Sequence, residues 1–79
     1  MLCSKCVIIS VIDNEMVDKK TGEKILYKTV NLELEGGELL KDVKTVKGST
    51  DGLIRFDEVK GYFRYDEEKR CLRFTGYSR

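Results

Sequence analysis

Residues 58–77, EVKGYFRYDEEKRCLRFTGY, decide the fold of this chain. Two runs rich in aromatic residues, 58–65 and 70–77, flank the polar segment 66–69. Two such runs joined by a short polar segment are typical of a β-hairpin. The sequence therefore predicts that the two runs pair as antiparallel strands.

One face of this predicted hairpin is apolar. A turn centred on residues 67–68 places Phe63 opposite Leu72. The same register places Gly61 opposite Phe74, whose ring is able to cover the bare glycine backbone. We therefore expect this face to lie against the core.

The other face of the predicted hairpin combines aromatic and basic side chains. Its members are Lys60, Tyr62, Arg64, Cys71, Arg73, Thr75 and Tyr77. Tyr62 lies opposite Arg73 in this register, close enough for a cation–π contact worth about 0.5–1 kcal/mol. Residues 60–79 contain six Lys or Arg against three acids, and the acids fall in the turn. This face is therefore expected to be free of acid.

This composition fits two interpretations. Exposed rings stack on the bases of a single-stranded nucleic acid, and cations follow its phosphates without reading sequence. The solvent faces of antiparallel hairpins in small proteins are also routinely built from Lys, Arg, Thr and Tyr. A one-residue bulge would move the side chains of one strand to the opposite face.

The N-terminal part of the chain predicts two further strands. Residues 2–12 are apolar at both alternating positions, as expected for a strand shared between two halves of a curved sheet. Residues 25–35 alternate regularly. Their predicted inward side chains are Leu26, Val30, Leu32 and Leu34, with Tyr27 outward. Residues 13–24 lose this periodicity and predict a long loop or the flared tip of a hairpin.

The middle of the chain is less regular. Leu39, Leu40 and Val43 have helical spacing, which predicts one or two helical turns over residues 38–44, but a short strand over 43–46 fits as well. Residues 48–52 form a strong loop signal, and 53–56 are a short apolar run. The prediction is a single mainly β domain, residues 1–79. It is a small antiparallel five-stranded barrel of OB-like type, with the helix over 38–44 as an optional element.

The composition limits the kinds of catalysis and metal binding that the chain can support. The chain has no His, which excludes Ser-His-Asp and Cys-His catalysis within it. Neighbouring carboxylates alternate faces on a strand or lie in a turn, so no catalytic residue is predicted and the protein is not expected to be an enzyme. Cys3 and Cys6 have the spacing of a metal or redox pair, but only Cys71 remains as a third thiol. We expect buried or incidental thiols, no metal and no cofactor.

No targeting segment is expected in the chain. Its longest apolar stretch, residues 7–12, is interrupted by Ser10 and is far shorter than a membrane span. Residues 1–6 contain a single lysine and no small-residue cleavage site. A cytoplasmic protein without a membrane partner is therefore expected.

The segment 18–24 is rich in lysine and contains the turn residues Lys19-Lys20-Thr21-Gly22. Its functional interpretation is a flexible arm that closes on a phosphate backbone, and its structural interpretation is a solvated hairpin tip. A first hairpin with this turn and a C-terminal aromatic and basic hairpin resemble the small OB-like single-stranded-DNA-binding proteins of phages and plasmids. The resemblance implies single-strand binding by a barrel face and the first hairpin loop, often in a homodimer. It carries over to Lys19, Lys20, Tyr27, Tyr62, Arg64 and Arg73.

The net charge of +1 is a departure from that group, many of whose members are visibly basic or carry an acidic tail. It is nevertheless the sum of two polarised regions. Residues 21–40 carry two cations and four acids, a local −2, whereas residues 60–79 carry +3. A nucleic-acid partner is therefore compatible with the small total.

Two functions follow as hypotheses. The first is sequence-tolerant binding of single-stranded nucleic acid, DNA in particular, through the aromatic and basic sheet face and the lysine-rich loop. Its predicted binding residues are Lys19, Lys20, Tyr27, Lys60, Tyr62, Arg64, Arg73 and Tyr77. The alternative is a small protein-interaction module, a phage or mobile-element regulator, that uses a sheet edge or the same face. A homodimer fits either function, since pairing would supplement a thin core.

Overall fold

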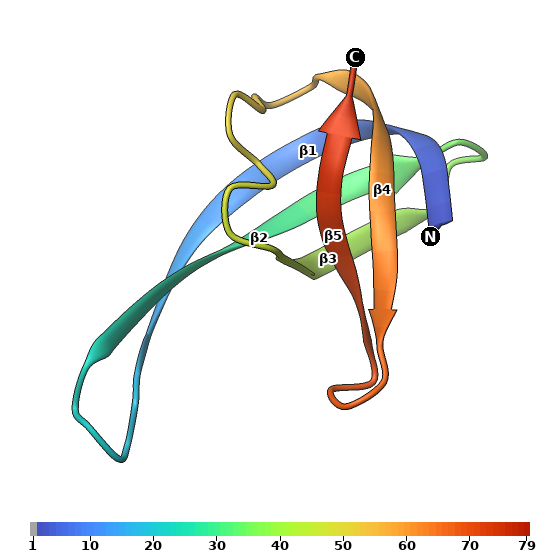
Figure 1. Cartoon of the computed structure of the whole chain (residues 1–79). Helices are drawn as coiled ribbons and strands as arrows, with labels where there is room; N and C mark the ends of the chain where they lie inside the picture. The colour runs from blue at the N-terminus through green and yellow to red at the C-terminus, as the bar shows by residue number, and fades with distance from the viewer. Residues whose placement is uncertain (1) are drawn as a thin grey trace.

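The computed structural model describes residues 2–79, which form five strands and no helix. The strands are β1 (Leu2–Val17), β2 (Lys24–Leu34), β3 (Leu39–Thr45), β4 (Glu58–Asp66) and β5 (Cys71–Ser78). They close into a barrel in the order β1-β2-β3-β5-β4 (Figure 1). Neighbouring strands are antiparallel except β3 and β5, which run parallel. The predicted small five-stranded OB-like barrel is confirmed.

Strand β1 is shared between two halves of the barrel, as its sequence predicts. Its first part pairs with β4 from Leu2 to Val7, and its longer second part pairs with β2 from Cys6 to Val17. The β1–β2 register shifts between Ile8 and Ser10. Because one inserted residue reverses the alternation of faces, Ile8 and Val11 both contact the core although they differ in parity. This bulge explains why the segment is apolar at both alternating positions.

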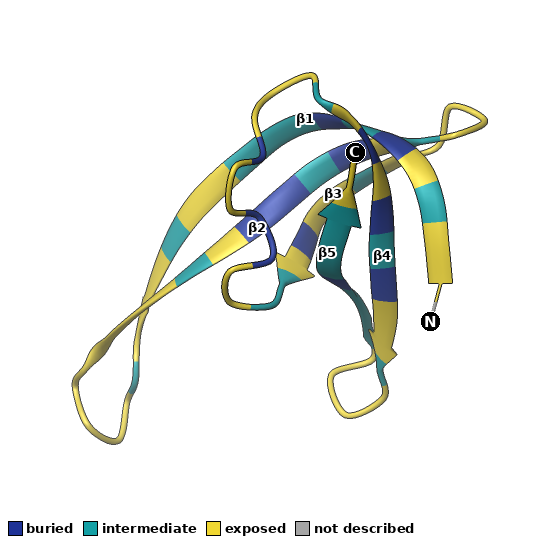
Figure 2. Cartoon of the chain, turned by 45° about the horizontal axis from the view of Figure 1, so that its top comes forward, coloured by how far each residue is buried: buried dark blue, intermediate teal, exposed yellow. Residues whose placement is uncertain are grey.

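The core is small and centred on two aromatic rings. Phe63 and Phe74 pack edge to face, with ring centroids 5.6 Å apart and an interplanar angle of 74°. Ile8, Val30 and Leu32 complete the centre and are fully buried. Figure 2 shows the buried residues gathered in the barrel, while the far end of the β1–β2 hairpin is exposed. The apolar hairpin face predicted from the sequence therefore does form the core.

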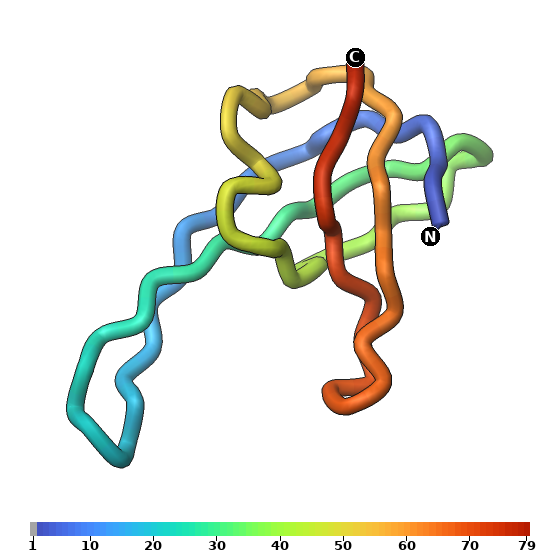
Figure 3. Tube along the Cα trace, in the orientation of Figure 1, coloured from blue at the N-terminus to red at the C-terminus, as the bar shows by residue number. Residues whose placement is uncertain are grey.

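The β1–β2 hairpin extends beyond the barrel as an arm, residues 12–29 (Figures 1 and 3). Pairing continues to Val17 opposite Lys24, so residues 13–24 are the flared tip of a hairpin and not a long loop. The turn closes with hydrogen bonds from Asp18 N to Glu23 O, 2.9 Å, and from Gly22 N to Asp18 O, 2.7 Å. Because the arm leaves the barrel, the prediction that Leu26 points into the core is wrong: Leu26 is 78% exposed.

Strand β3 occupies the segment for which a short helix was predicted, and that prediction is wrong. Its register with β2 passes from Val30–Val43 to Leu32–Leu40, so two residues oppose Asn31. One of them, Asp42, has φ 55°, and its N–H donates to Asn31 Oδ1 at 2.7 Å. This bulge turns Leu40 and Val43 to the same side, because the inserted residue gives a strand the three-residue apolar spacing of a helix.

Among residues 2–79 there is no helix long and apolar enough to span a membrane.

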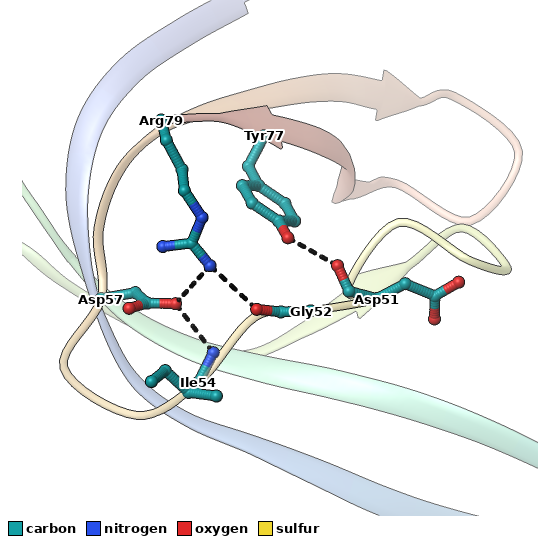
Figure 4. Close-up of polar contacts among 6 residues, drawn as sticks. All are labelled: Asp51, Gly52, Ile54, Asp57, Tyr77 and Arg79. Atoms are coloured by element: carbon teal, nitrogen blue, oxygen red, sulfur yellow. Dashed lines mark hydrogen bonds and ion pairs between the residues drawn. The ribbon is translucent and has the colours of Figure 1, made fainter.

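Residues 46–57, the cap loop, connect β3 to β4 across one end of the barrel (Figure 1). Leu53 anchors the loop in the core and is 8% exposed. Two hydrogen bonds from the end of the chain hold the loop: Tyr77 Oη donates to Asp51 O at 2.5 Å, and Arg79 Nη2 donates to Gly52 O at 2.9 Å (Figure 4). The cap loop is therefore held by the core beneath it and by the end of the chain.

Asp57 organises the end of the cap loop. Its Oδ2 accepts hydrogen bonds from Arg79 Nη2 at 3.0 Å and from Ile54 N at 2.9 Å (Figure 4). Both bonds favour the charged carboxylate, and they lower its pKa, the Arg79 hydrogen bond contributing most. The ionised form of Asp57 thus stabilises the folded state.

This arrangement predicts a sensitivity to acid. A carboxyl group whose pKa is lower in the folded state stabilises that state above its unfolded pKa, about 3.9, and loses the contribution as the pH falls through the folded value. We expect the urea midpoint of the wild type to fall between about pH 5 and pH 3 more steeply than that of Asp57→Asn. Tyrosine fluorescence follows the unfolding. Equal acid sensitivity of the two proteins would contradict the role given to Asp57.

Candidate nucleic-acid interface

The β4–β5 hairpin carries most of the predicted binding residues, but its register differs from the predicted one. The turn contains residues 67–70, and Arg70 has φ 51°, so Phe63 pairs with Phe74 and Arg64 with Arg73. The predicted opposition of Phe63 and Leu72 is therefore wrong. The shift is by two residues, which keeps the side chains on their predicted faces up to Phe74.

A bulge then reverses the faces near the end of β5. The register passes from Phe63–Phe74 to Tyr62–Gly76, so Thr75 is an inserted residue. Gly61 consequently pairs with Tyr77, and Tyr77 packs against the core. Tyr77 does not share the outer face with Tyr62 as predicted, and instead holds the cap loop.

Tyr62 stays on the outer face with a different partner from the one predicted. It lies opposite Gly76 and not Arg73. The cation beside its ring is Lys60, with Nζ 6.0 Å from the ring centroid. The Tyr62 hydroxyl lies 3.1 Å from Ser78 Oγ, so one edge of the ring is fixed. The predicted Tyr62–Arg73 contact is replaced by a contact within β4.

Pairing between strands brings three cations side by side. Arg64 of β4 lies opposite Arg73 of β5, and Arg73 lies beside Lys44 of the parallel strand β3. We call Lys44, Arg73 and Arg64 the basic row. Like charges directly opposite one another destabilise a sheet, so the row stores a repulsion that an anion would relieve.

One acid reaches the basic row. Asp66 accepts from Arg73 Nη2 at 3.1 Å, so the prediction of an acid-free face is wrong. The backbone N–H of Lys69 and the Arg73 guanidinium lower the pKa of Asp66 and keep it charged. Arg64 and Lys44 are exposed, and neither forms an ion pair with another residue of the described chain. Two cations of the row therefore remain available.

Tyr27 extends the basic row onto the arm. Its ring lies under Lys44 Nζ, which is 4.8 Å from the ring centroid. The contact follows from the register, because Thr29 pairs with Lys44 and Tyr27 lies two residues further along the same face of β2. A tyrosine and a lysine from different strands thus meet where the arm leaves the barrel.

A second pair of like charges lies near the other end of the same outer face. Lys5 of β1 pairs with Lys60 of β4, one alternate position from Tyr62. The outer face of β3, β5, β4 and the start of β1 therefore combines the basic row with Lys5, Lys60 and Tyr62, and Glu58 is the acid next to Lys60 on the same side of β4; we call it the basic face. Lys5 and Lys44 were not among the predicted residues. The alternative prediction of a short strand over 43–46 was the one sequence signal that could have indicated Lys44. The pairing of Lys5 depends on the closure of β1 onto β4, which no local pattern indicates.

The structure separates Lys19 and Lys20 from the basic face. Both lie exposed in the turn at the tip of the arm (Figure 1). Lys20 N donates to Asp18 Oδ1 at 2.9 Å, which shapes the turn. Cross-strand ion pairs of the arm, Lys24–Glu15 at 3.3 Å and Lys28–Asp13 at 3.7 Å, balance its other lysines. The arm therefore does not close over the hairpin in this structure.

The three cysteines are free thiols in different environments. Cys3 is exposed, Cys6 is buried and Cys71 is half-buried. Burial raises the pKa of Cys6, against a smaller lowering by its hydrogen bond with the Gly61 backbone, so its thiol is protonated and unreactive at neutral pH. Cys3 and Cys6 lie on opposite faces of β1, since Cys3 pairs with Tyr62 on the outer face and Cys6 with Val59 in the core. Within residues 2–79 no group of three or more potential ligands is placed to hold a metal ion.

The candidate interface is thus the basic face, which carries Tyr62, together with Tyr27 of β2 beside the basic row. Comparisons of the chain with models of protein families, with curated proteins and with solved structures found no match.

Proposed function

We propose that the protein binds single-stranded nucleic acid, DNA in particular, along the basic face. The observation that carries this proposal is the basic row, in which Lys44, Arg73 and Arg64 lie on three neighbouring strands with one acid among them. A folded domain of near-zero net charge gains no stability by placing cations together. A bound polyanion would stabilise the arrangement, because its phosphates neutralise the cations and its condensed counterions are released.

The two tyrosines support a single strand over a duplex. Tyr62 and Tyr27 are half-buried and flank the row, and each ring has a lysine beside it. An aromatic ring stacks on an unpaired base with about 1–3 kcal/mol, whatever the base. OB-like barrels bind oligonucleotides on the face of their second and third strands and with the β1–β2 and β4–β5 loops; of the residues named here, Tyr27 of β2 and Lys44 of β3 lie on that part of the barrel. Both loops project from the end of the barrel opposite the cap loop (Figure 1).

A titration of a fluorescently labelled single-stranded oligonucleotide at two salt concentrations tests the proposal. Each phosphate contact on a single strand contributes about −0.7 to the slope of log K against log salt. We expect clear binding at low salt and a slope of roughly −2 to −3, from Lys44, Arg64 and the Lys5–Lys60 pair. Absent binding at low salt, or binding that does not depend on salt, would contradict the proposal.

The arm favours a second candidate, a protein-interaction module. Leu26, Met16 and Ile25 of the arm are 78%, 50% and 42% exposed, and β3 pairs with β2 only from Thr29 onward. An exposed apolar hairpin with free edges is suited to pairing with another chain, including a second copy of this one. Capture of partners from lysate with and without nuclease separates the two functions: partners that survive nuclease favour this second one. Light scattering measures the molar mass in solution and so tests whether the protein is a homodimer.

A further inference from the structure

The three cations of the basic row differ in their surroundings. Arg73, the middle one, has 19% of its side chain exposed and forms an ion pair with Asp66, whose side chain is 24% exposed. Lys44 and Arg64, on either side of it, are exposed and have no acid partner within residues 2–79. One acid therefore neutralises the central cation of the proposed interface and leaves its two neighbours charged.

The register of the β4–β5 hairpin brings Asp66 to the outer face. Asp66 pairs with Cys71, and Arg64 pairs with Arg73. Alternate residues of a strand lie on the same side of the sheet, so Asp66 lies two residues beyond Arg64 and diagonal to Arg73. Asp66 is also the last residue of β4. Its carboxylate thus lies at the margin of the basic row, beside any group that binds Arg73.

The two carboxylate oxygens of Asp66 have separate partners. Oδ1 accepts a hydrogen bond from Lys69 N at 3.2 Å, within the β4–β5 turn. Oδ2 accepts from Arg73 Nη2 at 3.1 Å. An uncharged amide oxygen also accepts from a backbone N–H, so it is able to replace Oδ1 in the turn. The turn therefore does not require the negative charge of Asp66, which acts on Arg73.

A phosphate and the Asp66 carboxylate compete for the same cation. Both are anions that pair with a guanidinium through charge-assisted hydrogen bonds. A phosphate that approaches Arg73 finds a carboxylate oxygen already 3.1 Å from Nη2, so its attraction to the cation is offset by repulsion from the acid. Arg73 consequently contributes little to phosphate binding while Asp66 is in place.

We propose that Asp66 is an autoinhibitory residue of the basic face, which withholds Arg73 from the phosphates of a bound strand. The inference rests on the proposed function and concerns the regulation of the same site. The basic face then binds with fewer cations than it contains, and removal of the charge of Asp66 strengthens binding.

The variant Asp66→Asn tests the inference in a salt titration with a labelled single-stranded oligonucleotide at neutral pH. Asparagine keeps an acceptor for Lys69 N and loses the charge. We expect the slope of log K against log salt to become steeper by about 0.7, and the affinity at low salt to rise about threefold, as for one additional phosphate contact.

Glu68→Gln is the matched control. Glu68 is exposed in the same turn and has no ion pair within residues 2–79, so the substitution changes the net charge equally without freeing Arg73. It is expected to leave the slope unchanged. An equal gain of slope and affinity in Glu68→Gln would make the effect one of net charge and would overturn the inference.

The double variant Asp66→Asn with Arg73→Gln separates inhibition from positioning. It removes the cation together with its acid, so the net charge stays +1, and we expect the wild-type slope. If Asp66 instead holds Arg73 ready for a phosphate, the double variant has a slope shallower than that of the wild type by about 0.7, and Asp66→Asn binds no more tightly than the wild type. Either result would overturn the inference.

The outcomes also separate this inference from the proposed function. Salt-dependent binding by the wild type with an unchanged slope in Asp66→Asn would overturn the inhibitory role and leave the basic face intact. A wild type and an Asp66→Asn variant that both lack salt-dependent binding would remove the proposed function and the inference together. A thermal melt of each variant confirms that it is folded.

Discussion

Phe74→Ala is expected to lose about 3–5 kcal/mol of unfolding free energy, the usual cost of truncating a buried aromatic. Phe74 is the largest fully buried side chain, and its ring packs edge to face with Phe63. A domain of 79 residues has roughly 4–12 kcal/mol in total, so the loss is a large share of it. Urea unfolding followed by circular dichroism measures the change.

Phe56→Ala is the matched control for this prediction. It deletes the same side chain from the cap loop, where Phe56 is 63% exposed. Its backbone, with φ 69°, is unfavourable for alanine and phenylalanine alike. The change is therefore expected to cost less than about 1 kcal/mol. Similar losses in the two variants would contradict the placement of the core around Phe74.

Neutralising the free cations of the basic row is expected to have the largest effect on binding. Lys44→Gln combined with Arg64→Gln removes two phosphate contacts while Asp66 keeps Arg73 in place. The salt slope for a single-stranded oligonucleotide should become shallower by about 1.4, and the affinity at low salt should fall about tenfold or more. Fluorescence anisotropy at several salt concentrations measures both quantities.

Arg55→Gln tests whether position or total charge is responsible. Arg55 is exposed on the cap loop, where its guanidinium lies 4.7 Å from the Phe56 ring centroid, and it is absent from the basic face. It should leave the slope unchanged, whereas Arg64→Gln alone should reduce it by about 0.7. If the two single variants weaken binding equally, the effect is one of net charge and the basic row is not the site.

Four of the five strands were predictable because each has an apolar face of its own. The alternation in residues 25–35 and the aromatic pattern of 58–77 predict strands that the structure confirms. Residues 2–12 predict a strand with cover on both sides, and β1 is indeed paired with both β2 and β4. Local residue pattern therefore indicates four of the strands, whereas the segment of β3 has the apolar spacing of a helix.

Two of the errors have the same physical cause, the β-bulge. A single inserted residue reverses every later face of a strand, and alternation alone does not reveal it. At Asp42 the bulge produces the apolar spacing that predicted a helix, and at Thr75 it turns Tyr77 into the core. Asp42 has a positive φ, a conformation that aspartate tolerates. Aspartate is also common in ordinary turns, so its presence in the sequence does not identify the bulge.

The candidate interface was predictable only in part. Tyr62, Arg64 and Arg73 lie on the outer face of one hairpin, where local pattern places them. Lys44 joins them through the parallel pairing of β3 with β5, and Lys5 through the closure of β1 onto β4. Such pairings depend on how the whole chain closes. No spacing within one segment encodes them.

The most direct test of the basic face is the backbone amide spectrum of the ¹⁵N-labelled protein during titration with a single-stranded oligonucleotide. We expect the largest shifts at Lys44, Tyr62, Arg64 and Arg73, with smaller ones at Tyr27, because these residues surround the predicted path of the strand. The cap-loop residue Arg55 should not shift. Shifts confined to the arm tip around Lys19 and Lys20, or to the cap loop, would contradict the basic face as the binding site.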